Sequence, residues 1–280
     1  MSADLGRALG FLHDFARRRA PVEVAVPGGF AVLDERYPGS HDDNKLIVPS
    51  WDGTDSEAAS ILLKAADEVL AAREHRLVCV DDDRIGTALA PAFAAAGYTH
   101  ETNLIMAHRG APPPSPSSPP SSPPSPSPSS PPSASSLPSS PPSRAERLEL
   151  AELLPVLRRD WRHTLPEASD EVVDGLARRV EARLLGADTV SFHGVRAPDG
   201  QIAARADLYA HGGVAQIEGV FTAAAYRGQG HARTLMTALL AEVAGAELVF
   251  LVADADDWPK DFYGRLGFHL LGRTHSFLRT

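Results

Sequence analysis

Apolar and polar positions in residues 144–280 follow helical spacing in some stretches and strand-like alternation or continuous apolarity in others. In order, they predict a short strand, two helices, three strands, a helix, an almost fully apolar strand, a short helix and a closing strand. The turn signals "PDGQ" and "HGGV" separate the three central strands, which indicates an antiparallel meander. The predicted fold class is α/β, with a mixed, mostly antiparallel sheet flanked by helices.

Residues 1–110 predict a shorter set of elements. An N-terminal helix precedes three extended runs, a long helix over 56–75, a strand, a helix over 85–97 and a closing strand. The last five of these elements repeat the order that closes residues 144–280. The repeated order predicts that the chain contains two related halves.

A short alignment supports this internal duplication. When "AFAAAGY" is placed over "FYGRLGF", Gly97 aligns with Gly267 and Phe93 with Tyr263. The second half therefore keeps a tyrosine hydroxyl at a position where the first half has none.

Between the halves, residues 111–143 consist almost entirely of proline and serine. Proline lacks the amide hydrogen that helices and ladders need, and serine buries little apolar surface, so this segment is expected to be a disordered linker. A plain spacer is favoured over a ligand for a proline-recognition module or a glycosylated stalk, because we read no secretion signal at the start of the chain. The predicted domains are thus 1–110 and 144–280.

Charge and cysteine content narrow the classes of partner. The chain has 27 basic and 36 acidic residues, a net charge of −9, so we expect no nucleic-acid partner and no membrane partner. The single cysteine, Cys79, excludes an internal disulfide and is expected to be a buried thiol rather than a reactive one. No apolar run reaches membrane-spanning length, and we expect a cytoplasmic protein.

One loop carries a local device for an anion. "YRGQGHAR", residues 226–233, leaves a predicted strand and enters a helix directly. A helix start has unpaired amide hydrogens and the positive end of the helix dipole, and Gly228 and Gly230 let the backbone approach a ligand closely. Arg227 adds a full positive charge. Neither a nucleotide-triphosphate loop nor a dinucleotide loop fits, because the first needs a lysine before serine or threonine and the second a third glycine.

The arginine, glycine and alanine spacing of this loop, with "FYGRLGF" about 30 residues later, resembles the GCN5-related N-acetyltransferase (GNAT) family across essentially all of 144–280. The resemblance implies acetyl-coenzyme A as co-substrate and a degenerate, truncated GNAT-like domain in 1–110. It places the pantetheine arm and acetyl carbonyl beside a splayed strand end, and the pyrophosphate on the loop and first helical turn. The coenzyme-binding residues it implies are Val220, Phe221, Thr222, Arg227, Gly228, Gln229, Gly230, His231, Ala232, Arg233 and Asp256.

Two side chains are candidates for catalysis. The attacking amine must lose a proton, because an alkyl ammonium with a pKa near 10.4 is mostly charged at neutral pH. Glu218 resembles the family's glutamate base, although a strand carboxylate can also be a surface group. Tyr263 resembles the tyrosine acid that protonates the departing thiolate, although it could simply pack against the sheet. The histidines, among them His193, His211, His231, His269 and His275, lack ligand spacing, and no metal site is expected.

In the first half, the segment equivalent to the loop reads "PSWDGTDSEA", without an arginine and with three acids. We therefore expect no coenzyme there, and a role for this half in dimerisation, stability or shaping the acceptor site. "HDDNK" at 41–45 and Trp51 could contact a substrate, but a solvated loop is the favoured interpretation.

The leading hypothesis from the sequence is an N-acetyltransferase that acts on a primary amine of a small molecule or peptide, by direct attack. The acidic balance mildly favours a cationic acceptor such as a polyamine or aminoglycoside, and a homodimer is possible. Two alternatives stay open: a non-catalytic acyl-coenzyme A sensor or scaffold, and an acyltransferase that uses longer acyl groups or an oxygen nucleophile.

Overall fold

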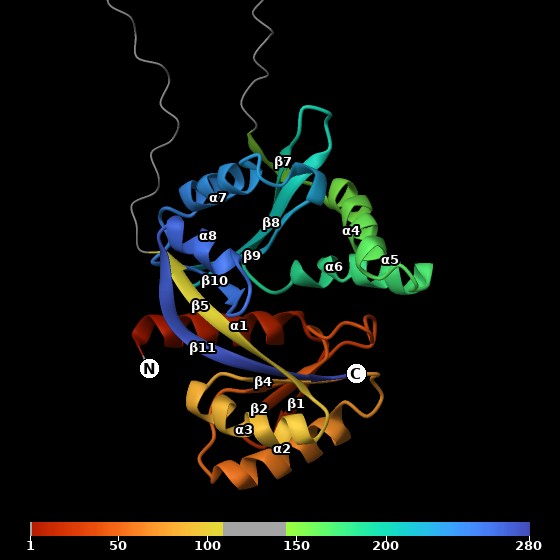
Figure 1. Cartoon of the computed structure of the whole chain (residues 1–280), viewed down its shortest axis with the longest axis vertical. Coiled ribbons are helices and arrows are strands. Elements are labelled where there is room, and N and C mark those ends of the chain that lie inside the picture. Colours follow the sequence, from red (N-terminus) through yellow and green to blue (C-terminus); the bar gives the residue numbers. More distant parts are fainter. Residues whose placement is uncertain (1, 109–143) are drawn as a thin grey trace, which may run out of the picture.

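The computed structural model describes residues 2–108 and 144–280 (Figure 1). The predicted linker, 111–143, lies outside the described residues. Both halves contribute strands to one sheet of 11 strands, in the order β1-β2-β3-β4-β11-β5-β10-β9-β8-β7-β6.

The first half contains α1 (Ala3–Arg19), β1 (Val22–Val26), β2 (Gly29–Leu33), β3 (Lys45–Val48), α2 (Asp55–Val69), β4 (Arg76–Val80), α3 (Asp83–Ala95) and β5 (Thr99–His108). The second half contains β6 (Ala145–Leu148), α4 (Leu150–Thr164), α5 (Asp170–Arg178), α6 (Val180–Arg183), β7 (Thr189–Arg196), β8 (Ile202–His211) and β9 (Val214–Thr222). It continues with the 3₁₀ turn η1 (Ala224–Tyr226), α7 (His231–Glu242), β10 (Leu248–Asp254), α8 (Pro259–Arg265) and β11 (Phe268–Arg279).

These elements confirm the predicted fold class and the order of elements in both halves. The differences are some element ends, the division of the second predicted helix of the second half into α5 and α6, and the added 3₁₀ turn η1. The helix expected over 56–75 ends at Val69, because the chain then turns so that the side chains of Arg73 and His75 contact Asn44 at 2.8 and 2.9 Å. Tertiary contacts of this kind override the local preference for helix.

The last strands of the two halves are exchanged. β11, from the second half, lies between β4 and β5, and β5, from the first half, lies between β11 and β10. β5 and β11 pair with each other antiparallel along most of their length, from Phe268 opposite His108 to Leu278 opposite Thr99. The two halves therefore share a continuous ladder.

The exchange gives the sheet an approximate two-fold symmetry. β3 and β4 are parallel, as are β9 and β10, while the β4–β11 and β10–β5 pairs are both antiparallel. Gly97 and Gly267, aligned above, both have φ in the left-handed region, at 85° and 94°. Phe93 and Tyr263 are both buried. This correspondence supports the predicted duplication.

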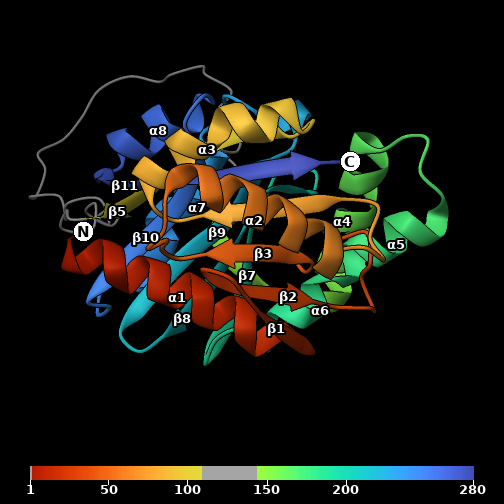
Figure 2. The ribbon, with the colours of Figure 1, turned by 90° about the horizontal axis from the view of Figure 1, so that it is seen from below.

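Helices cover the two faces of the sheet differently (Figures 1 and 2). On β5, Leu104 and Met106 face the core that contains α7 and α8, whereas Ile105 and Ala107 face α1. α2 and α3 cover the first half on the α7 side. On the other side, α1 crosses the sheet and packs on strands of both halves, with Phe11 and Phe15 beside Tyr209 and Phe250.

Candidate functional site

The site begins where β9 and β10 part. The two strands pair in parallel only from Val214–Leu248 to Gln216–Phe250, although β9 continues to Thr222 and β10 to Asp254. Each strand keeps its outer partner to its end, β10 with β5 and β9 with β8, so the two strands separate from each other beyond Gln216 and Phe250. The splayed strand end that the sequence predicted is therefore present.

A bulge accompanies the splay. The pairing of β8 with β9 shifts by one residue between the Asp207–Glu218 and Arg205–Phe221 pairs. Gly219 lies at the shift with φ of 62°, in the left-handed region that only glycine adopts without strain. A bulge of this kind re-aims the side chains that follow it. Glu218 thus stays on the α1 side, while Val220 packs against the core on the α7 side.

The loop before α7 has the backbone that its glycines predicted. Gly228 and Gly230 have φ of 75° and 85°, and a Cβ at either would meet no atom within 4 Å. Gly230 is the N-cap of α7 and offers no side-chain cap, so the first amide groups of the helix remain available to an anion. The 3₁₀ turn η1 connects β9 to this loop.

These elements enclose the loop-side cavity, of about 620 Å³. Nine of the predicted coenzyme-binding residues line it, as does the candidate acid Tyr263; the nine are Val220, Phe221, Thr222, Arg227, Gly228, Gly230, His231, Ala232 and Arg233. The other two predicted coenzyme residues, Gln229 and Asp256, are not among its lining residues.

Gln229 and Asp256 are held by their own loops. The amide of Gln229 donates to the carbonyl of Ala225 at 3.1 Å, and Asp256 is exposed beside Asp254. Asp257, the next residue along the chain, lines the cavity instead. The resemblance placed the coenzyme contact at Asp256, one residue before the aspartate that lines the cavity. A sequence pattern does not decide between two neighbouring residues of a turn.

Positive charge collects around the loop-side cavity. Arg227, Arg233 and Arg265 line it, all three exposed, and none makes an ion pair within residues 2–108 and 144–280. Among the described residues, the guanidinium of Arg227 donates only to the carbonyl oxygen of Thr222, at 3.2 Å. Three unmatched guanidinium groups beside a free helix N-terminus have the charge and the donors to bind a polyanionic ligand.

Sequence reasoning missed several lining residues: Tyr226, Asp257, Trp258, Pro259, Phe262 and Arg265. Trp258 has an exposed fraction of 66%, large for a side chain of its size. Its local sequence, "DWPKDF", gives no periodicity that would separate a binding tryptophan from a surface one. Spacing to "FYGRLGF" is the one signal that could have pointed to α8 as a wall.

Tyr263 lies on the α8 wall and is 7% exposed. Burial, together with the charges of Glu218 and Asp257, raises the pKa of Tyr263 to about 12. The hydroxyl therefore keeps its proton at neutral pH, as a group that must donate a proton or a hydrogen bond requires.

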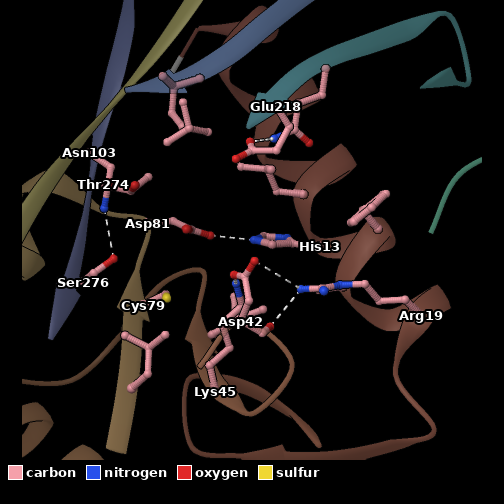
Figure 3. A pocket seen from close by; sticks show the side chains of 18 of the residues that line it. His13, Arg19, Asp42, Lys45, Cys79, Asp81, Asn103, Glu218, Thr274 and Ser276 are labelled. Carbon is pink, nitrogen blue, oxygen red and sulfur yellow. Dashed lines mark hydrogen bonds and ion pairs between the residues drawn. The ribbon is translucent and has the colours of Figure 1, made fainter. Parts of the chain in front are cut away.

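Glu218 faces the opposite side of the splay. It lines both a middle cavity of about 380 Å³, under α4 to α6, and a central cavity of about 250 Å³, under α1 (Figure 3). Its carboxylate accepts a hydrogen bond from the Gln216 amide at 2.7 Å. Burial raises the pKa of the Glu218 carboxyl, against the opposing charge of Arg183. A carboxylate shifted toward neutrality is a better proton acceptor at physiological pH.

The three cavities share walls. Val220 and Phe221 line both the loop-side and the middle cavity, and Asp42, Arg183 and Glu218 line both the middle and the central cavity. The middle cavity thus lies between the loop-side cavity and the central cavity, whose charged lining residues come from both halves.

The segment at 41–45 contributes to the lining of the central cavity, and the prediction that it is a solvated loop is wrong. Asp42 and Lys45 line the central cavity, and Asp43 and Asn44 are buried. Arg19, which lies beside Asp42 in Figure 3, explains the difference, because its guanidinium bonds the Asp42 carbonyl and the Asp43 carboxylate. This partner comes from α1 and is invisible in the local sequence.

The equivalent region of the first half is closed. Strands β3 and β4 pair to their ends at Val48 and Val80, without a splay. Thr54 and Glu57 cap the start of α2 with a reciprocal pair of side-chain hydrogen bonds. The ring of Trp51 fills the space against Gly28 and Gly53. The first half thus differs at this point from the loop before α7, and that it holds no coenzyme stays a prediction.

Other candidate groups have structural partners. His193 bonds Ser191 at 2.8 Å, His211 stacks on Phe11, and His275 lies 2.9 Å from Asp83. Within the described ranges no three histidine, cysteine or acidic side chains gather as a metal site. Cys79 lines the central cavity, and burial raises the pKa of its thiol.

Comparison with protein families identifies the class of this site. Residues 150–268 match the acetyltransferase (GNAT) family. Residues 150–268 therefore form a domain of this family, and acyl transfer is the chemistry that the family supports.

Solved structures extend the likeness to the whole chain. A conserved protein of unknown function from Staphylococcus epidermidis ATCC 12228 superposes with a TM-score of 0.60 and 13% identity, over 91% of this chain and 92% of its own. A GCN5-related N-acetyltransferase from Kribbella flavida superposes with a TM-score of 0.58 and 17% identity, over 99% of this chain and 95% of its own. A tandem GNAT protein from the clavulanic acid biosynthesis pathway superposes with a TM-score of 0.51 and 15% identity, over 99% of this chain and 94% of its own. The fold is thus a tandem GNAT arrangement.

Comparison with curated proteins gave no match. Along the residues that the structure describes, no helix combines the length and apolarity needed to cross a bilayer.

Proposed function

We propose that this protein is an N-acetyltransferase that transfers an acetyl group from acetyl-coenzyme A to a primary amine of a small molecule or peptide. The observation that carries the proposal is the splay between β9 and β10, because it joins an unmatched cationic cavity on the α7 side to a carboxylate on the α1 side. Acetyl-coenzyme A supplies the activated acyl group.

The arginines and the amides at the start of α7 would hold the pyrophosphate, and the pantetheine arm would follow β9 toward the splay. Backbone groups of Val220, Phe221 and Thr222 on the β10 side lie beyond the last β9–β10 pair. Apart from the Thr222 carbonyl oxygen, which accepts from Arg227, they would bond the arm and polarise the thioester carbonyl.

In the reaction, the amine nitrogen attacks the thioester carbonyl carbon from the α1 side, so that a C–N bond forms and the C–S bond breaks. Glu218 accepts the proton of the amine, directly or through one water. Tyr263 gives its proton to the departing thiolate and is reprotonated from solvent. Positioning the two reactants on either side of the splay supplies the rest of the rate enhancement.

Thiol release from acetyl-coenzyme A, measured over libraries of primary amines, tests this function. We expect at least one class of amine to support turnover, and Tyr263→Phe to lower kcat by on the order of 100-fold or more with the dissociation constant of acetyl-coenzyme A nearly kept. Unchanged turnover would remove Tyr263 from the mechanism. Binding of the coenzyme without turnover of any amine would instead favour a sensor or scaffold.

A further inference from the structure

Two charged side chains stand out among those that line the middle and central cavities. Most of the others have an ion-pair partner: Arg183 with Asp207, Arg205 with Asp160, Lys45 with Asp42, Arg19 with Asp43 and His13 with Asp81. Glu218 and Arg179 line the middle cavity together, and neither makes an ion pair with any residue that the structure describes.

Arg179 is fixed in place without being neutralised. Its guanidinium donates to the Ser40 hydroxyl at 3.0 Å and lies 5.4 Å from the centre of the Trp161 ring. Ser40 in turn donates to Asp43, whose charge is already taken by Arg19. Arg179 is therefore a preorganised cation that faces the cavity without a counter-ion.

Gln216 adds an independent observation on the other side of Glu218. The side chain is 3% exposed and its amide nitrogen bonds Glu218, but its carbonyl oxygen Oε1 is buried without a partner in the described part of the chain. A buried acceptor left unpaired costs stability unless a ligand or water donates to it. Gln216 lines the central cavity, so a donor could reach it there.

One ligand chemistry satisfies all three groups. An amino group would bond Glu218 and Gln216, and an anionic group would bond Arg179. The cations near Asp42 do not compete, because Lys45 and Arg19 together hold the pKa of Asp42 well below its usual range and remain paired with it. At about 380 Å³, the middle cavity is large enough for a small molecule of this kind.

We propose that the acceptor is an amine that also carries a carboxylate, as an amino acid does, with its amino nitrogen at Glu218 and its carboxylate at Arg179. This inference rests on the proposed acetyl transfer and narrows its acceptor. It replaces the cationic acceptor that the net charge favoured, because the local pairing of charges decides recognition at a buried site. It also gives the first half a task, since Ser40 holds Arg179.

The test compares amino acids with the amines that lack only their carboxylate, for example ornithine with putrescine and alanine with ethylamine, in the thiol-release assay. For the best pair, we expect kcat/KM for the amino acid to exceed that for the amine by on the order of 10- to 100-fold, the range of a charge-assisted hydrogen bond. Arg179→Gln should remove most of this preference, and Arg179→Lys should keep part of it.

Arg178→Gln is the matched control. Arg178 precedes Arg179 in the chain, but it is exposed, pairs with Glu181 and lines neither cavity. We expect the Arg178→Gln variant to prefer the amino acid over the matching amine by the same ratio of kcat/KM as the wild type. An amine that is used as well as its amino acid, or an Arg179→Gln variant that loses both substrates by the same factor, would overturn the inference and leave the acetyltransferase function standing.

If no amine supports thiol release, the proposed function fails, and calorimetric titration of the same pairs into the intact protein still decides the inference. Tighter binding of the amino acid in wild type, lost in Arg179→Gln, would support a zwitterion site. Equal binding of both members of the pair would contradict it.

Discussion

Glu218 and Tyr263 reach the junction of β9 and β10 from opposite sides of the sheet, and their electrostatic coupling is visible in the pKa of Tyr263, which the Glu218 charge helps to raise. Burial shifts the pKa of each group in the direction that suits the role we propose for it. Tyr263 holds a proton at neutral pH, and Glu218 becomes a stronger base than an exposed carboxylate. The opposed roles are those expected of an acid and base pair.

The raised pKa of Glu218 predicts a pH dependence. The protonated carboxyl cannot accept a proton, so kcat/KM should fall as pH is lowered through this pKa, which lies above the ordinary value for glutamate. Glu218→Gln should lower kcat/KM by on the order of 100-fold and abolish this acidic limb. Protonation of the acceptor amine should lower kcat/KM equally in both proteins as pH falls, so the test is the further decline at the pKa of Glu218. If that further decline persists in Glu218→Gln, Glu218 is not the base.

At the scale of elements, the site depends on the loop that joins β9 to α7. Gly228 has φ of 75° and open space where a Cβ would stand, on the side where we place the pyrophosphate. Gly200, in the turn between β7 and β8, has φ of 83° and equally open space, but it lies outside the loop-side cavity.

This pair of glycines gives a matched experiment. Gly228→Ala and Gly200→Ala should each lower the free energy of unfolding by about 1 kcal/mol, because both place alanine at a positive φ. Gly228→Ala alone should weaken binding of acetyl-coenzyme A, by on the order of tenfold or more. Equal coenzyme affinity in the two variants, measured by calorimetry, would argue against a pyrophosphate at this loop.

Elements of this kind were predictable because their signals are local. The apolar spacing of α7, the paired glycines before it and the run "LVFLVAD" of β10 each lie within one short stretch, and all three were placed correctly. That Asp42 and Lys45 line the central cavity was not predictable, because α1 and its Arg19 come close to this segment only in the folded chain. The position of Arg179 was likewise not predictable, because the Ser40 hydroxyl that holds its guanidinium lies far away in the sequence.

At the scale of the whole molecule, the exchange of β5 and β11 makes the halves one structural unit. The exchange leaves no sign in the sequence, because each strand follows its own helix in the expected order and only pairing across the halves reveals it. The cavities that both halves line lie on the α1 side of this joint. We therefore propose that the first half shapes the acceptor site and holds no coenzyme of its own.

The central claim is that this chain has two related halves and one working acetyl-coenzyme A site. Calorimetric titration of the full chain with acetyl-coenzyme A tests it most directly. We expect one coenzyme per chain, with binding weakened at least tenfold by Arg227→Glu and unchanged by Arg84→Glu, an exposed arginine of the first half. No binding, two coenzymes per chain, or equal affinity in Arg227→Glu would contradict the account.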